Sequence, residues 1–412
     1  MHPSRRTALR GGLAVAAGAA GLTGLAARTH AAPIADNARE LIIATVGDAM
    51  SGPVLHNGAE IAVDQINQSG GVLGCRLKLH SETVEWDKVN VRTEAIKIAA
   101  RVVGRGDVIA VIGHSDVGDA LPAAITYLRH DSLLIVPTIT TTSLTMHGLH
   151  NIFATLPDNG DLSTQTARFV ADLGLKRGFI MRGRGYDPLE ISLAYRDTAA
   201  VLGLTIVDEV SLASLSRTHD FIPRLQGKQF DHLVLIAPLE WQVQLVRFAA
   251  DLGLNVLCVL PTIYQSPTVV QQQLTAALGD TKGRPFKLRT LVPVLRDHRA
   301  PTPEQAEWER TYKERYHSEP VDQAMQATDA VNLVVEGLKE VGRISMPGQD
   351  DAATRKAVID ELIQVMHGEL AYRGLSGRFS FNRSGRIYTR LLGFASIRSA
   401  DAKDTAYYMP GV

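Results

Sequence analysis

The run Leu41-Ile42-Ile43-Ala44-Thr45-Val46, which ends at Gly47, determines how the rest of this chain is interpreted. Six consecutive apolar or β-branched residues are typical of a strand that is buried on both faces. Residues 58–67 follow with apolar side chains at helical spacing, and Ser69-Gly70-Gly71 ends that pattern. Glycine adopts the left-handed backbone that a helix end favours. A second strand at residues 77–79 completes a strand–helix–strand unit.

The same alternation continues as far as residue 278. Further strands are predicted at residues 108–112, 133–136, 177–181, 204–210, 232–236 and 256–259. Helices are predicted at residues 89–103, 119–129, 161–173, 189–202, 240–252 and 268–278. Strands separated by helices of about ten to fifteen residues indicate parallel sheets with helices on both faces.

The order of elements changes after residue 284. A strand is predicted at residues 288–292, and three successive helices at residues 303–316, 320–341 and 351–367. The tail predicts an antiparallel hairpin with arms at residues 377–381 and 387–394 and a turn at 382–385. A chain that ends in helices and then a strand pair is expected to cross between its two halves more than once.

The N-terminus has the three parts of an export signal. Residues 2–10 are polar and positive, residues 11–27 are almost wholly Gly, Ala, Leu and Val, and small residues follow. We expect residues 1–32 to be removed and the protein to reach the periplasm. The pair Arg5-Arg6 indicates the twin-arginine route, although Ala8 stands where a bulky apolar residue is usual. The alternative is a membrane anchor, but an apolar stretch of about 17 residues is short for a span of about 20.

Charge and length restrict the class of protein. The chain has 43 basic and 43 acidic residues. Removing residues 1–32 removes four arginines and no acid, which leaves a net charge of about −4 and argues against nucleic-acid binding. About 380 mature residues are too many for one core, so two lobes are expected. Cys75 and Cys258 are far apart in sequence, and we expect two free buried thiols.

Six loops that follow predicted strands are the candidates for a binding site, because ligands in open parallel sheets bind beyond the carboxyl ends of the strands. The loops are residues 47–53, 113–119, 137–143, 182–187, 237–241 and 261–265. Small hydroxyl side chains in the first three can hold an anion such as a carboxylate. Tyr186, Trp241 and Tyr264 in the others offer apolar surface. The alternative is that the hydroxyls only cap helices and the aromatic rings only pack.

Enzyme motifs are not found in the sequence. His114, Asp116 and Asp119 share one loop, but no second His and no Cys stands at metal-ligand spacing. A lone His at a strand end is more often structural. The chain has no Gly-x-Ser-x-Gly elbow, no phosphate loop and no His-Glu-x-x-His. We therefore expect no catalysis, no cofactor and no metal.

Several stretches together resemble, in order and spacing, the branched-chain amino-acid (Leu/Ile/Val) binding proteins of ABC importers, which are type I periplasmic binding proteins. The matching stretches are residues 49–53, 57–60, 66–74, 111–114 with Pro122, 137–140 with Leu144-Thr145, Tyr186, and the Gly-Arg-Phe-Ser-Phe-Asn-Arg-Ser-Gly ending at 377–385. The resemblance spans nearly the whole mature chain.

The resemblance implies an α/β fold of two Rossmann-like lobes, joined by three crossovers and closing on the ligand by hinge bending. Lobe 1 would comprise residues 38–157 plus 286–374, and lobe 2 residues 158–285 plus 375–412. The crossovers would lie near residues 156–160, 284–287 and 374–377. The family's ligand carboxylate would be held by Ser115, Gly118, Thr138 and Thr140. The amino group of the ligand would be held by acidic and tyrosine side chains, mainly of the other lobe.

The sequence departs from the family at three positions. Val117 stands where a serine commonly holds the carboxylate, Thr262 stands where an acid commonly meets the amino group, and Pro238 replaces an aromatic residue. Since a buried charge needs a partner, the missing acid argues against a free amino group there, and so against Leu, Ile or Val. An amide, another organic acid or a different amino acid fits as well. Possible substitutes are Asp116, Asp119, Asn159 and Glu240.

We expect a monomeric periplasmic protein that captures a small polar ligand and delivers it to an ABC permease complex in the inner membrane. The alternative is a sensor that reports the same occupancy to a signalling receptor. The predicted ligand-binding residues are Ser51, Ser115, Asp116, Gly118, Thr138, Thr140, Asn159, Tyr186, Glu240, Trp241, Thr262 and Tyr264.

Overall fold

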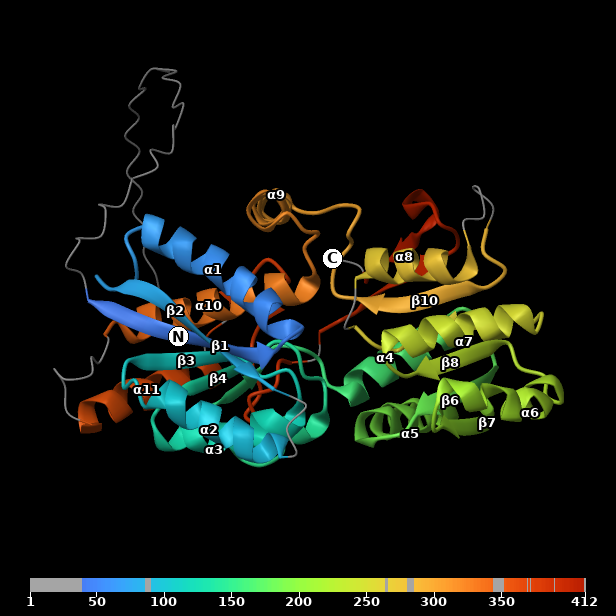
Figure 1. Cartoon of the computed structure of the whole chain (residues 1–412), viewed down its shortest axis with the longest axis horizontal. Helices are drawn as coiled ribbons and strands as arrows, with labels where there is room; N and C mark the ends of the chain where they lie inside the picture. Colours follow the sequence, from blue (N-terminus) through green and yellow to red (C-terminus); the bar gives the residue numbers. More distant parts are fainter. Residues whose placement is uncertain are drawn as a thin grey trace, which may run out of the picture.

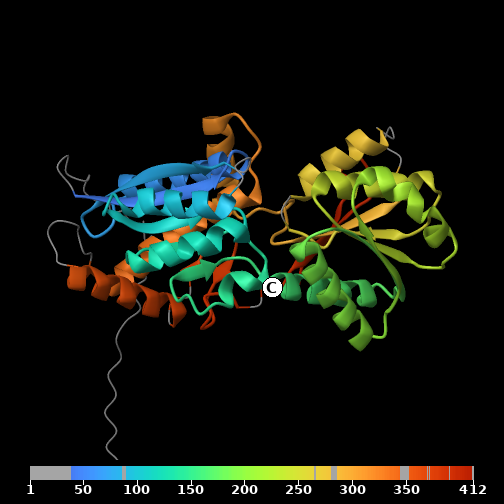
Figure 2. The ribbon, with the colours of Figure 1, turned by 60° about the horizontal axis from the view of Figure 1, so that its bottom comes forward.

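The computed structural model describes residues 39–85, 90–263, 266–279, 285–343, 352–368, 370, 372–388 and 390–410. The predicted export signal at residues 1–32 and the side chain of Tyr264 lie outside the described residues. The chain forms two α/β lobes that lie side by side (Figures 1 and 2). Among the described helices, none is both long enough and apolar enough to span a bilayer.

The first lobe contains a five-stranded sheet in the order β2-β1-β3-β4-β5, and every pairing in it is parallel. Its strands are β1 (Glu40–Asp48), β2 (Arg76–Val84), β3 (Val108–Gly113), β4 (Leu133–Val136) and β5 (Ile152–Ala154). Residues 41–47 are buried, as the apolar run predicts. The short strand β5 was not predicted, because three residues carry no distinctive pattern.

Helices cover both faces of this sheet (Figure 1). The helices of this lobe are α1 (Ser51–Gln68), α2 (Val91–Val103), α3 (Val117–Arg129), α9 (Pro303–Tyr316), α10 (Asp322–Val341) and α11 (Ala352–His367), with a 3-10 turn η1 (Thr142–Thr145). Of these, α9 packs on α1 and α10 and not on the sheet. Helix α1 begins seven residues before its predicted start. The Oδ1 of Asp48 accepts hydrogen bonds from the amides of Met50 and Ser51 at 2.8 and 2.7 Å. Pro53 lies in the first turn, where proline is tolerated.

The second lobe contains a seven-stranded sheet in the order β14-β13-β10-β9-β8-β6-β7. Its strands are β6 (Arg177–Gly183), β7 (Thr205–Leu212), β8 (His232–Ile236), β9 (Leu257–Val259), β10 (Arg289–Val294), β13 (Gly393–Ile397) and β14 (Ala406–Tyr408). The pairings from β7 to β10 are parallel, and β13 and β14 add antiparallel partners. The helices of this lobe are α4 (Asn159–Asp172), α5 (Tyr186–Val201), α6 (Ile222–Gln226), α7 (Leu239–Asp251) and α8 (Pro267–Leu278), with 3-10 turns η2 (Leu215–Phe221) and η3 (Ala402–Asp404).

The sheets place two crossovers differently from the predicted lobe bounds. β10 pairs with β9 and β13, so residues 289–294 lie in the second sheet and not in lobe 1. Residues 378–387 lie with the first lobe, because Phe379, Phe381 and Ile387 pack in its core. The chain therefore crosses between the sheets at residues 155–158, 295–302 and 388–392.

The predicted tail hairpin forms only around its turn. The Gly385 amide donates to the Asn382 carbonyl at 2.9 Å, and Phe381 and Ile387 form an antiparallel bridge. The first arm otherwise pairs elsewhere, because β12 (Arg378–Phe379) pairs with β11 (Tyr372–Arg373). The chain then leaves for the second lobe, where β13 pairs with β10. Alternating apolar residues at 387–394 divide between two different cores, and the sequence pattern does not reveal this.

The two cysteines are buried and unpaired, one in each lobe, which confirms the predicted free thiols. Burial raises the pKa of the Cys258 thiol to about 12. This thiol is therefore protonated at neutral pH and acts as a small apolar side chain.

Candidate functional site

Polar side chains of the first lobe gather at the carboxyl edge of its sheet. The loops after β1, β3 and β4 meet there because the strands are parallel. They enclose a cavity of about 310 Å³. It is lined by Asp48, Ser51, Ser115, Asp116, Val117, Thr138, Ile139, Thr140, Asp187 and Gln323. Five of the predicted residues therefore share one cavity: Ser51, Ser115, Asp116, Thr138 and Thr140.

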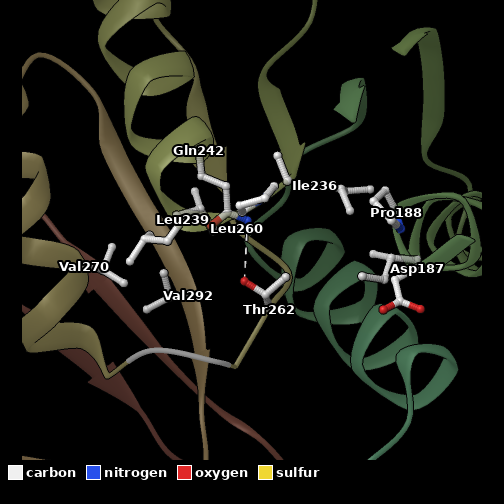
Figure 3. A pocket seen from close by; sticks show the side chains of 12 residues that line it. Asp187, Pro188, Ile236, Leu239, Gln242, Leu260, Thr262, Val270 and Val292 are labelled. Atoms are coloured by element: carbon white, nitrogen blue, oxygen red, sulfur yellow. Dashed lines mark hydrogen bonds between the residues drawn. The ribbon is translucent and has the colours of Figure 1, made fainter. Parts of the chain in front are cut away.

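A second cavity of about 340 Å³ lies in the other lobe and is mostly apolar (Figure 3). It is lined by Asp187, Pro188, Ile191, Ile236, Ala237, Pro238, Leu239, Gln242, Leu260, Thr262, Val270 and Val292. The Gln242 side chain spans its wall: Nε2 donates to the carbonyl of Leu235 at 2.9 Å and to Thr262 Oγ1 at 3.5 Å. Asp187 belongs to both linings, so the two cavities adjoin at this residue.

Asp48 organises the first of these loops. Its Oδ1 accepts the hydrogen bonds from the two backbone amides described above, and its Oδ2 accepts one from Ser115 Oγ at 3.0 Å. Burial favours the neutral acid, but the hydrogen bonds from Ser51, Met50 and Ser115 outweigh it and lower the pKa of Asp48. Asp48 is therefore ionised at neutral pH and links the loop after β1 to the loop after β3.

Asp116 caps helix α3. Its Oδ1 accepts from the amide of Gly118 at 2.6 Å, and the Oδ1 of Asp119 accepts from the amide of Asp116 at 3.2 Å. The Asp116 side chain also accepts from the amide of Asp119, and this bond together with the one from the Asp116 amide forms a capping box. Burial raises the pKa of Asp116; the Gly118 amide opposes this, and the charges of Asp119 and Asp187 raise the pKa further.

His114 lies behind this loop and does not line the cavity. Its Nε2 lies 2.9 Å from the Tyr127 hydroxyl, its Nδ1 lies 3.2 Å from Asp119 Oδ2, and the ring is fully buried. Thr138 Oγ1 donates to the His114 carbonyl at 2.8 Å. His114 therefore supports the loops from the interior. No cluster of three or more His, Cys, Asp or Glu suited to a metal occurs among the described residues.

The first turn of α5 contacts the first lobe directly. Thr141 Oγ1 donates to Asp187 Oδ1, and the amide of Thr142 donates to Glu190 Oε1 at 3.2 Å. Asn159 Nδ2 donates to the other oxygen of Glu190. Burial raises the pKa of Glu190, these hydrogen bonds oppose it, and the nearby charge of Asp187 raises it again. These contacts hold α5 beside the loop that carries Thr140.

The remaining predicted residues lie outside the first-lobe cavity. Gly118 and the exposed ring of Tyr186 line a neighbouring groove of about 760 Å³, and Thr262 lines the second-lobe cavity. Asn159 is buried against Glu190. Glu240 is exposed on α7, and Trp241 packs against the second-lobe core, so neither lines the two cavities.

Sequence reasoning did not select Asp48, Asp187 or Gln323. Asp48 and Asp187 both follow strands, which is the signal that could have found them. Asp187 places an acid of the second lobe at these cavities, in addition to the substitutes that the sequence suggests for Thr262. Gln323 comes from α10, far along the chain, and no local pattern marks it.

Two α/β lobes whose strand-end loops share adjoining cavities define a two-lobed binding protein. The chain belongs to the periplasmic binding protein family, which matches residues 43–402. It is similar to the substrate-binding proteins of branched-chain amino acid ABC transporters, which are solute-binding proteins and not enzymes. The predicted α/β fold of type I periplasmic binding proteins is thereby confirmed.

Individual relatives support this placement. A Leu/Ile/Val-binding protein of Rhizobium johnstonii is 30% identical over 160 residues, which span 39% of this chain and 42% of that relative. A Desulfitobacterium hafniense ABC transporter substrate-binding protein in complex with Leu has a TM-score of 0.70 at 20% identity, covering 90% of this chain and 100% of that chain. A Rhodopseudomonas palustris solute binding protein in complex with 3,4-dihydroxybenzoic acid has a TM-score of 0.69 at 16% identity, covering 90% and 96%. These structures establish the fold, and their different ligands show that the fold does not determine the ligand.

Proposed function

We propose that this protein is the solute-binding component of an ABC importer, which captures a small polar ligand between its lobes and delivers it to a membrane permease complex. One observation carries the proposal. Asp187 of the second lobe lines both the polar first-lobe cavity and the apolar second-lobe cavity. A ligand beside Asp187 would touch both lobes, as capture between lobes requires.

Hinge closure is part of the proposal. Among the described elements, the chain passes from one sheet to the other at residues 155–158, 295–302 and 388–392, and small rotations at these segments would change the separation of the lobes. Two hydrogen bonds join the lobes here: Thr141 of the first lobe donates to Asp187 of the second, and the amide of Thr142 donates to Glu190. Rotation could break these few hydrogen bonds without disturbing either core.

The binding residues belong to the proposal as well. We assign contact with the ligand to Ser51, Ser115, Asp116, Thr138 and Thr140 in the first lobe, together with Asp48 and Gln323. Asp187 and Thr262 are the contacts from the second lobe. Export through the twin-arginine route, directed by residues 1–32, would bring the folded protein to the periplasm.

The test is a ligand screen on the mature chain by thermal shift, followed by calorimetry and small-angle scattering. The panel contains amines, amino acids, amides, aliphatic acids and aromatic acids. At least one class should raise the melting temperature and reduce the radius of gyration, because a ligand that binds only the folded closed form stabilises it. A complete lack of stabilisation across the panel would contradict the proposed function.

A further inference from the structure

Three of the four residues expected to hold a ligand carboxylate already donate hydrogen bonds to acceptors of the protein. Ser115 Oγ donates to Asp48 at 3.0 Å, and the Gly118 amide donates to Asp116 at 2.6 Å. Thr138 donates to a backbone carbonyl of the loop after β3 at 2.8 Å. A carboxylate only accepts hydrogen bonds, so it would have to displace these internal acceptors to bind.

The same cavity has an excess of acceptors. Asp48, Asp116 and Asp187 line it, and none of the described residues that line it is Lys, Arg or His. The Asp116 carboxylate accepts from the amides of Gly118 and Asp119, and the Asp187 carboxylate accepts from the Thr141 hydroxyl at Oδ1. A carboxylate offers about four lone-pair positions, so both retain capacity to accept from a ligand.

A buried cation lies close to this region but does not neutralise the cavity. Arg386 donates through Nη1 to the carbonyl of Ile139 and through Nη2 to the carbonyl of Thr141. It lies behind the loop and does not line the cavity. The charges that act on the pKa of Asp116 are those of Asp119 and Asp187, and both raise it. A positive charge between these carboxylates would relieve their repulsion.

The second-lobe cavity indicates what kind of body the ligand carries. From Asp187 it continues along aliphatic side chains, and Figure 3 shows Asp187 at one side and Val270 and Val292 at the other. Of the described residues that line it, only Asp187, Gln242 and Thr262 are polar. A ligand head at Asp187 would therefore place an attached apolar body against this wall, where burial contributes about 25 cal/mol per Å².

We infer that the ligand is an organic cation: a protonated amine that lies between Asp116 and Asp187 and carries an apolar body in the second-lobe cavity. This inference rests on the function proposed above and names the chemical class of its ligand. It differs from the sequence-based expectation of a bound carboxylate, because the hydrogen-bond donors described above already donate to acceptors within the protein.

The test compares probes that share one body and differ in charge. 3-Methylbutylamine, leucine and 4-methylpentanoate form an aliphatic set; 2-phenylethylamine, phenylalanine and 3-phenylpropanoate form an aromatic set. Each is titrated into the mature chain by calorimetry at neutral pH. The amine of at least one set should bind about tenfold or more tighter than its acid, a difference of about 1.4 kcal/mol.

The outcomes separate this inference from the proposed function. If an acid binds as tightly as its amine, or if leucine binds more tightly than 3-methylbutylamine, a carboxylate is being held and the inference is overturned, while solute capture stands. If neither amine binds, the inference is overturned as well, and the broader screen then decides whether the protein binds any solute.

Two variants test which carboxylates bind the ligand's positive charge. Asp187→Asn should weaken amine binding about tenfold or more, and Asp116→Asn should weaken it in the same direction while asparagine keeps the helix cap. Asp197→Asn, exposed on the same helix as Asp187, is the matched control and should leave affinity unchanged. Circular dichroism melting verifies that each variant folds. Unchanged amine affinity in folded Asp187→Asn and Asp116→Asn would overturn the assignment.

Discussion

Replacing Arg386 tests how the site loops are held in place. The side chain is buried, and its guanidinium donates to the carbonyls of Ile139, Leu156 and Thr141 at 3.1, 3.3 and 2.7 Å. Two of these carbonyls flank Thr140 in the cavity loop, and the third, that of Leu156, lies in the first crossover. Arg386 thus joins the tail of the chain to the loop after β4.

The magnitude follows from the three hydrogen bonds. Each bond from a charged donor is worth about 1.5–3 kcal/mol, which would sum to about 4–9 kcal/mol if the bonds were independent. Removing a buried charge also removes its desolvation cost, and the loop relaxes, so the net loss is smaller. We expect Arg386→Ala to lower the free energy of unfolding by about 3–5 kcal/mol. Arg386→Lys keeps the charge without the planar fork and should lose about 1–3 kcal/mol.

Urea unfolding followed by circular dichroism measures the effect, with Arg383→Ala as the control because Arg383 is exposed in the neighbouring turn. The control should change stability by less than about 0.5 kcal/mol. A loss below about 1 kcal/mol for Arg386→Ala would refute the reasoning, since it would mean that the three carbonyls find other partners without cost.

Further predictions concern packing, the site, pH and thiol chemistry. A methyl group added in Gly58→Ala would lie 1.9 Å from the Ala324 carbonyl oxygen; it should force α1 and α10 apart and lower stability by about 3 kcal/mol or more in urea unfolding. Thr140→Val should weaken ligand binding by about 1–3 kcal/mol in calorimetry, and unchanged affinity would remove Thr140 from the site. Burial raises the pKa of Asp329 to about 6, so its neutral form stabilises the fold; this contribution is complete below about pH 4 and is lost as the pH rises through about 6. The melting temperature of the wild type relative to Asp329→Asn should therefore rise as the pH falls from 7 to 4, and a flat difference would contradict it. Cys258 should resist thiol reagents until the protein unfolds, and rapid labelling of the native state would be the contrary result.

Local periodicity explains most of what the sequence predicts correctly. Helix α9 has its predicted bounds, Pro303–Tyr316, and β8 has its predicted bounds, His232–Ile236. Both patterns are complete within the element itself. The crossovers were misplaced because they depend on pairing between distant segments: β10 belongs with β13, about 100 residues later in the chain.

The residues of the candidate site also divide into those that local sequence position predicts and those that depend on distant contacts. Strand-end position brought Ser115, Thr138 and Thr140 into one cavity, since parallel topology follows from the alternation of elements. Asp187 also lies after a strand, but its role depends on how closely the second lobe approaches the first, which strand-end position does not show. The sequence does not predict the role of Gly118. Its amide donates a hydrogen bond to Asp116, two residues earlier, and only the backbone geometry reveals this bond.

The position of Asp187 also explains how ligand binding could be coupled to lobe closure. In the proposed hinge motion, separation of the lobes would break the hydrogen bond from Thr141 to Asp187 and the bond from the amide of Thr142 to Glu190. These are few contacts, so on their own they favour closure only weakly. A ligand that contacts Asp116 and Asp187 together binds well only while the lobes are close. Its differential affinity for the closed arrangement therefore sets how far the population shifts.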